Sequence, residues 1–551
     1  MSTSRSAMFD LADRAVDEIA AADPCAATEM GVPGVDDRLT DYSPSGIGER
    51  AQQANDLVMA ARELVSGPDV HPQDAQAAAV MTERLSAVVG MSVEGDFLRD
   101  VNVLASPPQA IRQAFELMAP NAEAAHARMS AVPAAMAGWR SALSEGLRRN
   151  HPAARRQALA VADQLQTIGA GWFAEHASQT YSDYESIAAP AQHADEAYLA
   201  TAQWLRTEYA PRADEADGVG EARYERHAIQ WLGDSIDLHE TYAWGWSLLR
   251  DYSAQIAALA ATLGASSPAL AKRMLDESPQ YTIEGEDNLL EYLRTVTESA
   301  IEELDGRYFD IDDRIRTCEV KIAGAGSAAA PYYVPPSEDL SRPGSTWYPT
   351  LGRTRFPRWW LLSVWYHESV PGHHLQLGTA ILQKDSLSRF QRLAGGTSGY
   401  WEGWALYSER LMDELGYFED PGVEMGYLVA QAMRAARVVI DIGLHLGMPI
   451  GADAGPKYAG LTWTPELAEQ VLVDEALLEP DFARSEVNRY LGLPGQAISY
   501  KVGERVWLAE REAAQQRLGD GFDLRQWHMY ALRAGHMGLA PFRSVMDGFG
   551  R

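Results

Sequence analysis

Residues 359–376 have the sequence WWLLSVWYHESVPGHHLQ. Three of the thirteen histidines, His367, His373 and His374, fall within it, and Glu368 directly follows the first. A histidine followed by a glutamate on an aromatic and aliphatic run is typical of the metal-binding helix of zinc hydrolases. Buried imidazoles also need polar partners. The sequence therefore predicts a metal site at this stretch.

The spacing of these histidines departs from the common H-E-x-x-H form, because Pro371 stands four residues after His367. A proline there removes the amide that would bond to the His367 carbonyl, and Gly372 permits backbone angles that other residues resist. In a straight helix, His367 and His374 would lie roughly 10 Å apart along the axis. One zinc ion with ligand distances of about 2.0–2.1 Å cannot easily bridge that gap. We therefore expect a break that returns His373 or His374 to His367.

The whole chain has the composition of a globular protein, with 46% hydrophobic and 23% charged residues among 551. A formal net charge of −30 disfavours nucleic acid and anionic membranes as partners. Cys25 and Cys318 are too few for a disulfide scaffold, and neither belongs to a CxxC motif. Residues 1–24 have no uninterrupted apolar core of the signal-peptide kind, and no stretch approaches eighteen apolar residues. These features predict a cytoplasmic protein.

Helical periodicity dominates the first half of the chain, where apolar residues recur three and four positions apart. Six helical segments are expected there, at residues 7–23, 47–66, 73–89, 109–147, 152–177 and 190–208. An exposed loop is expected at 214–221, before a second helical block at 222–305. We therefore predict a mainly α, metallopeptidase-like fold, with an N-terminal helical region at 1–305 and a metal-site helical region at 306–551 that form one catalytic body.

The sequence changes character after residue 305. Residues 319–322 predict a short strand, followed by a flexible stretch rich in glycine and alanine at 324–331. Residues 332–350 are rich in proline and aromatic side chains, which favours either an irregular connection or a cover over the site. Residues 346–348 are expected to form an edge strand that pairs with an extended peptide. This segment is the small β element predicted near the metal site.

Carboxylates follow the histidines on another helix, after a loop at 395–400. Glu402, Glu409 and Asp413 share one face of it at i, i+7 and i+11. Aromatic neighbours leave little room for a polar face, so Glu402 and Glu409 are expected to be at least partly buried. A buried carboxylate needs a cation or a metal. This helix can therefore supply the third protein ligand of a catalytic zinc site.

Further polar side chains lie later in the chain. His445 stands one helical turn after Asp441, and Arg489, Tyr490 and Tyr500 surround a second Pro-Gly pair. A lone histidine such as His445 is more often a core or helix-end residue. Tyrosine and arginine near zinc are nevertheless suitable donors to the oxyanion of a tetrahedral intermediate. Tyr500 is the preferred donor, with Tyr490, Arg489 and His445 as alternatives.

Several of these motifs together resemble a known family. HESVPGHHLQ at 367–376, EGWALYSE at 402–409, DIGLH at 441–445, RY with PGQAISYKVG within 489–503, and GVPGVDDRLTDYSP at 31–44 carry the resemblance. They are similar to the bacterial family called domain of unknown function 885, over nearly the whole chain. That resemblance implies a mostly helical zinc metallopeptidase, distantly similar to the thimet oligopeptidase and carboxypeptidase Taq groups.

The resemblance also implies roles for individual residues. Those groups carry Gly-His-Ala-Leu at their second histidine, which matches residues 372–375, so His373 would be the ligand and His374 a neighbour that supports the site or faces the substrate. Their third ligand is a glutamate with a second glutamate seven residues on, similar to Glu402 and Glu409. Glu409 would then orient a ligating histidine. The chain departs from the pattern by a two-residue expansion before His373.

We therefore expect a zinc-dependent hydrolase of amide bonds, most of all a metallopeptidase for short peptides, with one zinc per chain held by His367, His373 and Glu402. Glu368 would take the proton of the attacking water and pass it to the leaving amine. An alternative is an amidohydrolase of a non-peptide amide or amino-acid conjugate in specialised metabolism. A third hypothesis is a helical binding protein without activity. The sequence does not predict the oligomeric state.

Overall fold

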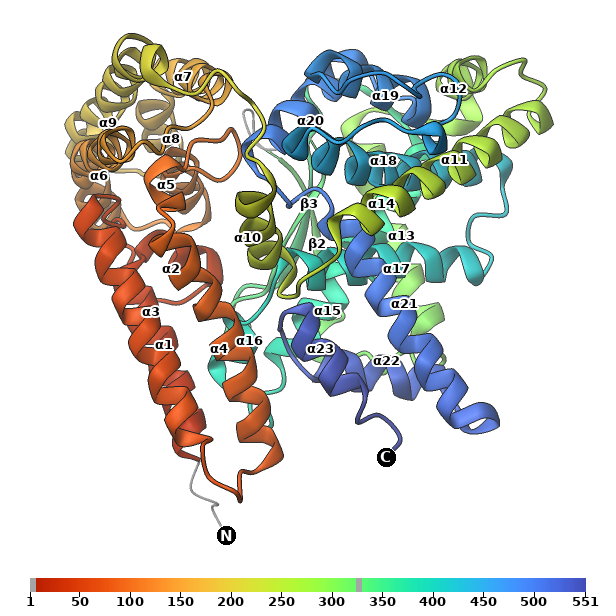
Figure 1. Cartoon of the computed structure of the whole chain (residues 1–551), viewed down its shortest axis with the longest axis horizontal. Helices are drawn as coiled ribbons and strands as arrows, with labels where there is room; N and C mark the ends of the chain where they lie inside the picture. The colour runs from red at the N-terminus through yellow and green to blue at the C-terminus, as the bar shows by residue number, and fades with distance from the viewer. Residues whose placement is uncertain (1–5, 324–329) are drawn as a thin grey trace. The chain divides into compact units, whose positions relative to one another are not determined.

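The structure, a computed structural model, describes residues 6–323 and 330–551. Most of the expected flexible stretch at 324–331 lies outside these residues. Helices make up most of the described chain, and the strands are few and short (Figure 1). The prediction of a mainly α protein with a small β element is therefore confirmed.

The contacts of the backbone divide the chain into two compact units. The first unit comprises Met1–Gln230, Ser388–Ala394 and Asn488–Pro494, and the second comprises Trp231–Leu387, Gly395–Val487 and Gly495–Arg551. These units do not coincide with the predicted regions 1–305 and 306–551. The difference arises because α11 (Leu238–Thr262) and α13 (Glu286–Leu304) pack on α18 (Pro421–Leu446) and α14 (Arg358–Glu368), respectively, of the second unit.

The first unit is helical. Its main helices are α1 (Ala7–Ala22), α2 (Pro24–Met30), α3 (Pro44–Leu64), α4 (Pro72–Val93), α5 (Pro107–Leu117), α6 (Ala122–Arg148), α7 (Arg155–Ile168), α8 (Trp172–Thr180), α9 (Tyr184–Trp204) and α16 (Arg389–Leu393). The expected helix at 109–147 is two helices, because Pro120 disfavours helix before it and the Asn121 side chain caps α6. The expected helix at 152–177 also divides, since Gly171 adopts a φ of 131°.

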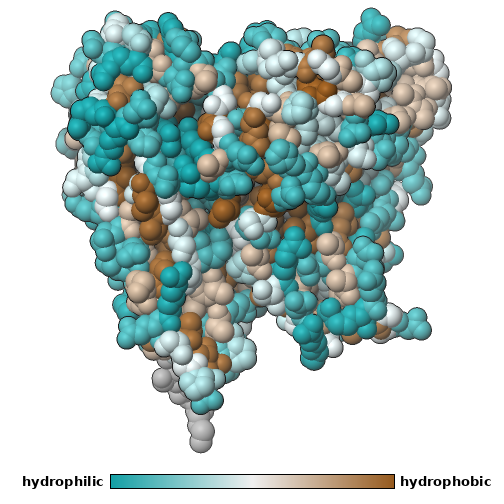
Figure 2. Space-filling view, in the orientation of Figure 1, coloured by the Kyte–Doolittle hydropathy of each residue, from teal (hydrophilic) through white to brown (hydrophobic). Residues whose placement is uncertain are grey.

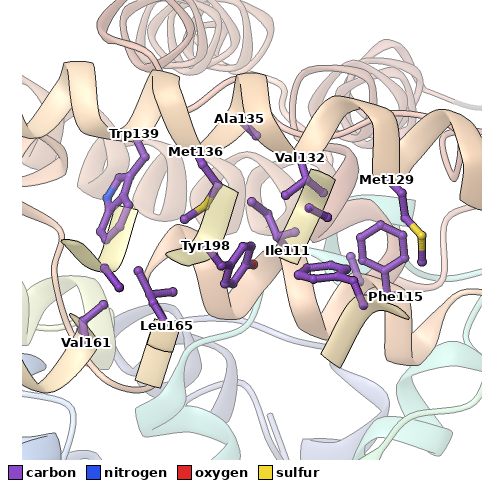
Figure 3. Packing of buried hydrophobic residues seen from close by; sticks show 14 of the residues in the cluster. Ile111, Phe115, Met129, Val132, Ala135, Met136, Trp139, Val161, Leu165 and Tyr198 are labelled. Atoms are coloured by element: carbon purple, nitrogen blue, oxygen red, sulfur yellow. The ribbon is translucent and has the colours of Figure 1, made fainter. Parts of the chain in front are cut away.

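The core of the first unit forms where α5, α6, α7 and α9 meet (Figure 3). Ile111 and Phe115 of α5 face the α6 residues between Met129 and Trp139. The Tyr198 hydroxyl of α9 donates a hydrogen bond to the Pro108 carbonyl at 2.7 Å, so its polar end is satisfied within an apolar cluster. Burial of each such large side chain stabilises the unit by about 1.5–3 kcal/mol.

The second unit carries the remaining helices. Besides α11, α13, α14 and α18 they are α12 (Pro268–Glu277), α15 (His373–Ile381), α17 (Ser398–Glu414), α19 (Pro465–Ala476), α21 (Ser499–Leu518), α22 (Leu524–Arg533) and α23 (Leu539–Met546). Helices α10 (Glu221–Leu232) and α20 (Pro480–Gly492) each contribute residues to both units. The long apolar helix α18 is buried along nearly its whole length, so it forms the centre of this unit.

Two small sheets belong to the second unit. β2 (Cys318–Ile322) pairs in parallel with β4 (Gly344–Tyr348), which pairs antiparallel with β3 (Tyr332–Val334). β1 (Thr282–Glu284) pairs with β5 (Arg355–Pro357). The expected strand at 319–322 is therefore confirmed. The expectation of an edge strand at 346–348 is wrong, because β4 is the central strand and both of its edges are occupied.

The visible surface is mostly hydrophilic, with apolar side chains in small patches (Figure 2). This distribution agrees with the large negative net charge of the sequence. In the described part of the chain, we find no helix with the length and apolar character needed to span a bilayer.

Candidate metal centre

The metal-site stretch contains the expected break. α14 ends at Glu368, α15 begins at His373, and the peptide bond between Val370 and Pro371 is cis. Both helices are buried where they meet, so the break places polar side chains inside the second unit. The prediction of a helix interrupted at Pro371-Gly372 is confirmed.

Gly372 is required at the break because two backbone segments approach each other closely. Its amide donates a hydrogen bond to the Tyr366 carbonyl at 3.0 Å. A Cβ atom at this position would lie 1.9 Å from the His367 carbonyl oxygen, a distance that no side chain can tolerate. The Trp404 indole of α17 donates to the Pro371 carbonyl at 2.9 Å, which satisfies an acceptor freed by the break. The turn is thus held from both sides.

The break brings together the three side chains expected to bind metal. One ligand atom each from His367, His373 and Glu402 lies within 4.8 Å of the others. The Glu402 carboxylate is 3.0 Å from Nε2 of His367 and 3.6 Å from Nε2 of His373. Two ligands of a tetrahedral zinc ion stand roughly 3.3 Å apart, so these separations fit one ion. Two imidazoles and a carboxylate are also a donor set found in catalytic zinc sites.

The other ring nitrogen of His367 is fixed by Glu409. Nδ1 donates a hydrogen bond to Glu409 at 2.9 Å, and the carboxylate also accepts from Arg434 at 3.1 Å and from the Ser363 hydroxyl. Burial would lower the pKa of His367, but hydrogen bonds to Glu402 and Glu409 raise it to about 9. The N–H at Nδ1 of His367 therefore keeps its hydrogen bond to Glu409, and Nε2 is the ring nitrogen that faces the candidate site.

Glu368 differs from the other two carboxylates. Its side chain is buried, and among the described residues none donates a hydrogen bond to it. Burial raises the pKa of Glu368, and the charges of His367 and His373 only partly oppose this shift. Glu402 has the opposite behaviour: despite burial, hydrogen bonds from the two histidines hold its pKa well below the usual value. Glu368 is thus the carboxylate free to accept a proton.

His374 does not join this cluster. Its Nε2 donates to the Ile315 carbonyl at 2.7 Å, and its Nδ1 accepts from the Tyr333 hydroxyl of β3 at 2.9 Å. Burial lowers the pKa of His374 to about 4, so the ring is neutral. A Cβ at Gly344 of β4 would lie 2.1 Å from that hydroxyl, so the glycine makes room for the contact. In the structure His374 attaches α15 to the sheet, and among the described residues no hydrogen bond joins it to the candidate ligands; a role of His374 towards the substrate stays a prediction.

The Tyr500 ring lies beside the metal cluster, on α21. It stacks on the His367 ring with centroids 6.1 Å apart and planes 18° apart. The Arg437 guanidinium lies 4.5 Å from the centre of the Tyr500 ring, and it also pairs with Glu486 at 2.7 Å. Tyr500 is therefore the expected oxyanion donor that the structure places against a candidate ligand.

The alternative donors have different surroundings. His445 is fully buried with Nε2 3.4 Å from Asp441, whose other carboxylate oxygen accepts from the Gly495 amide at 2.9 Å. This pair supports the second Pro-Gly turn. Arg489 and Tyr490 belong to the first unit, where the guanidinium lies 5.3 Å from the centre of the ring. A role for these three residues in the site stays a prediction.

Sequence reasoning missed several residues that position the cluster. Ser363 stands one turn before His367, a spacing that could have indicated their common partner. Arg434 is a charge within the apolar run of α18, which signals a buried acidic partner. Gly403 and Gly503 allow α17 and α21 to touch, since a Cβ on Gly403 would lie 2.5 Å from the Gly503 carbonyl carbon. The close contact of these two helices cannot be recognised from the sequence alone.

The fold and the cluster define a class of protein: a mainly α chain with a small sheet beside a buried histidine–glutamate centre. A family model described as "Bacterial protein of unknown function (DUF885)" matches residues 24–546. The chain therefore belongs to this family, as the resemblance indicated. No curated protein matches the chain.

Two solved structures are similar to the chain. One, from Colwellia psychrerythraea and described as a "putative lipoprotein", has a TM-score of 0.85 and 21% identity, with 98% of each chain covered. Another, from Shewanella oneidensis and described as a "putative lipoprotein of unknown function", has a TM-score of 0.71 and 19% identity, with 98% of this chain and 100% of that chain covered. At these identities the likeness shows the fold.

These descriptions contradict the prediction of a cytoplasmic protein. That prediction rested on the lack of a long apolar run in residues 1–24, and such an observation does not decide the compartment of a folded domain. The cytoplasmic location is therefore not retained.

Proposed function

We propose that this protein is a zinc-dependent hydrolase of amide bonds that acts on short peptides. The observation that carries the proposal is the convergence of His367, His373 and Glu402 beside Glu368, a buried carboxylate to which no residue of the described chain donates a hydrogen bond. When bound by these ligands, zinc supplies Lewis acidity and makes a water more acidic near neutral pH.

Glu368 carries the proton in this proposal. Its carboxylate accepts a proton from the attacking water and delivers it to the nitrogen of the leaving amine. Burial raises the pKa of Glu368, which brings its proton affinity nearer to the operating pH and suits both halves of the transfer. A general base fixed by strong donors would perform this step less well, because its basic lone pairs would be occupied.

Glu409 and Arg434 act through His367. The carboxylate holds the imidazole in the tautomer with a proton on Nδ1, so that Nε2 is free to bind a metal. Arg434 neutralises Glu409 from the other side, at 3.1 Å. These two contacts of Glu409 fix the plane of the His367 ring before a metal binds. The affinity for the metal is higher as a result, because less ordering of the side chain is needed on binding.

Tyr500 is the proposed donor to the developing oxyanion. Its contact with the His367 ring places it at the cluster, and Arg437 over its ring favours a fixed orientation. A phenol that donates where negative charge develops lowers the barrier of amide hydrolysis. Tyr490, Arg489 and His445 remain the alternatives for this role.

The test combines metal analysis with a digest of a peptide library. We expect about one zinc per chain, cleavage of short peptides, loss of cleavage after chelation and its return when zinc is added. Cleavage of small amide conjugates but not of peptides would favour the amidohydrolase alternative. A protein that binds no zinc, or that holds zinc and cleaves neither class, would contradict the proposal and favour the binding-protein hypothesis.

A further inference from the structure

The first unit contains a cavity of about 390 Å³ that the proposed function does not use. Its walls come from helices α1 to α6, of which α1, α3 and α4 run side by side (Figure 1). Most of the lining is apolar and includes Ile47, Leu85, Val88, Phe97 and Trp139. A recess of this volume, largely apolar with a few polar groups, is typical of a site for a small organic molecule.

Acidic groups outnumber basic ones in the lining. Three carboxylates, those of Asp23, Glu29 and Asp100, face one cation, Arg50. The Arg50 guanidinium donates to the backbone carbonyl of Asp41 at 2.6 Å rather than to a carboxylate. The cavity therefore holds negative charge that its own walls do not neutralise.

The three carboxylates differ in how far their hydrogen bonds are satisfied. Asp23 is engaged, because it accepts from the Ala26 amide at 3.1 Å and the Thr40 hydroxyl at 2.5 Å. Asp100 accepts from the Asn102 side-chain amide at 2.9 Å. Glu29 accepts no hydrogen bond from any residue that the structure describes. Glu29 and Asp100 are therefore the acids with acceptor capacity left for a ligand.

The electrostatics of the two acids are consistent with a missing cation. Burial raises the pKa of Asp100 to about 7. The Glu29 side chain is exposed where it lines the cavity, and its partial desolvation there, with a further contribution from the negative charge of Asp23, raises its pKa. A partly desolvated carboxylate such as Asp100 is costly without a cation beside it, and a bound cation relieves that cost, whereas the exposed Glu29 carboxylate is reached by a ligand directly from solvent.

We propose that this cavity binds a small organic amine. Its ammonium group is held by the carboxylates of Glu29 and Asp100, and its aliphatic or aromatic body packs against the apolar wall formed by Phe97, Trp139 and their neighbours. The lining excludes an anion, because carboxylates outnumber the one guanidinium. The site is independent of the histidine cluster, whose ligands belong to the second unit.

The test measures binding of three probes to the full chain by titration calorimetry. The probes are 2-phenylethylamine, 3-phenylpropanoate and 2-phenylethanol, which share an aromatic body and differ in charge. We expect the amine to bind and the other two to bind at least roughly tenfold more weakly, since one charge pair in a recess is worth about that factor. Equal binding of all three, or no binding of the amine at millimolar concentration, would overturn the proposal.

Matched variants locate the site. Glu29→Gln and Asp100→Asn should each weaken amine binding roughly tenfold, whereas Glu63→Gln, an exposed glutamate on α3 outside the cavity, should leave it unchanged. Ala26→Leu adds bulk to the cavity wall and should abolish amine binding without lowering the melting temperature, because it fills empty space. Amine binding that survives Ala26→Leu, or that is lost equally in Glu63→Gln, would place the ligand elsewhere.

Discussion

The histidine cluster and the cavity of the first unit both contain carboxylates, but the surroundings of these carboxylates shift their pKa values in opposite directions. Glu402 and Glu409 are hydrogen-bonded to His367, and their pKa values are lowered despite burial. Among the residues that the structure describes, Glu29 and Asp100 have no cation in contact, and desolvation raises their pKa values. Burial alone therefore does not determine the state of an acid in this chain; the partner does.

Glu368 is the exception within the cluster. It stands beside the ligands, yet burial raises its pKa as it does for the cavity acids. In the proposed mechanism, neighbouring carboxylates therefore have two different tasks: Glu402 and Glu409 stay charged to hold a cation and a histidine, and Glu368 stays free to exchange a proton. Pairs of acids whose environments push their pKa values apart are typical of catalytic sites.

The largest effect is expected for the free carboxylate of the cluster. Glu368→Gln should lower the rate of hydrolysis by roughly 10³-fold, because the amide cannot accept the proton, while zinc content and melting temperature remain unchanged. Glu298→Gln, an exposed glutamate on α13, is the matched control and should retain full activity. Wild-type turnover in Glu368→Gln would remove this residue from the mechanism.

The next effect separates the histidines. His367→Ala should weaken zinc binding by at least about 100-fold, because it removes a protein ligand and the partner of Glu409. His374→Ala should retain zinc but destabilise the fold by about 1–3 kcal/mol, since Ile315 and Tyr333 lose their partner. Zinc content and denaturant unfolding measure both changes. Loss of zinc in His374→Ala alone would reverse the assignment.

A smaller effect is expected for the orienting carboxylate. Glu409→Gln keeps the shape of the side chain but no longer fixes the His367 tautomer by charge, so zinc affinity should fall roughly 10–100-fold. Competition with a chelator of known affinity gives the value. An unchanged zinc affinity would mean that Glu409 contributes only to packing and that its hydrogen bond to His367 has no role in metal binding.

Zinc binding should also depend on pH. His367 has a pKa of about 9 in the absence of metal, so below that value the ion must displace a proton. Affinity should therefore rise about tenfold per pH unit from neutral pH towards 9 and then level off. Calorimetry in buffers of different ionisation enthalpy counts the released protons. Binding at neutral pH without proton release would contradict the hydrogen-bonded arrangement around His367.

The smallest effect concerns the cavity. Asp100→Asn should raise the free energy of unfolding by about 1 kcal/mol at pH 8 in the absence of ligand, because a poorly compensated charge is removed. Folding raises the pKa of Asp100, so its charge destabilises the folded protein at every pH above the pKa that Asp100 has in the unfolded chain. The increase in the free energy of unfolding that Asp100→Asn gives should therefore vanish as the pH falls to about 4. Exposed Asp56→Asn should show no gain. An equal increase in the free energy of unfolding for Asp100→Asn and Asp56→Asn would show that the surroundings of Asp100 have no special effect, and the difference between the cavity and the histidine cluster would no longer hold.

The sequence by itself determined the local features of the candidate centre. The proline ring of Pro371 and the missing Cβ of Gly372 act within one helical turn, so the break could be predicted without knowledge of the rest of the fold. The seven-residue spacing of Glu402 and Glu409 places both on one helix face for the same reason. The mainly helical class followed from periodicity, which is also a local property.

Only the tertiary structure decided which partners those residues meet. His374 is excluded from the cluster by Ile315 and by the Tyr333 hydroxyl, which lie 59 and 41 residues away in the chain. Likewise, Arg434 reaches Glu409 because α17 and α18 belong to one unit. Such contacts depend on how distant segments pack, and a single sequence has no periodicity that encodes them.

The same reason accounts for the remaining differences. β4 is a central strand because β2 and β3 pair with both of its edges, and its own sequence does not reveal these partners. The cavity in the first unit is formed by helices that are each unremarkable in sequence, and its unpaired acids become significant only when Glu29 and Asp100 face the same space. Local chemistry is encoded by neighbouring residues, whereas the pairing of buried charges is decided by the packing of the whole fold.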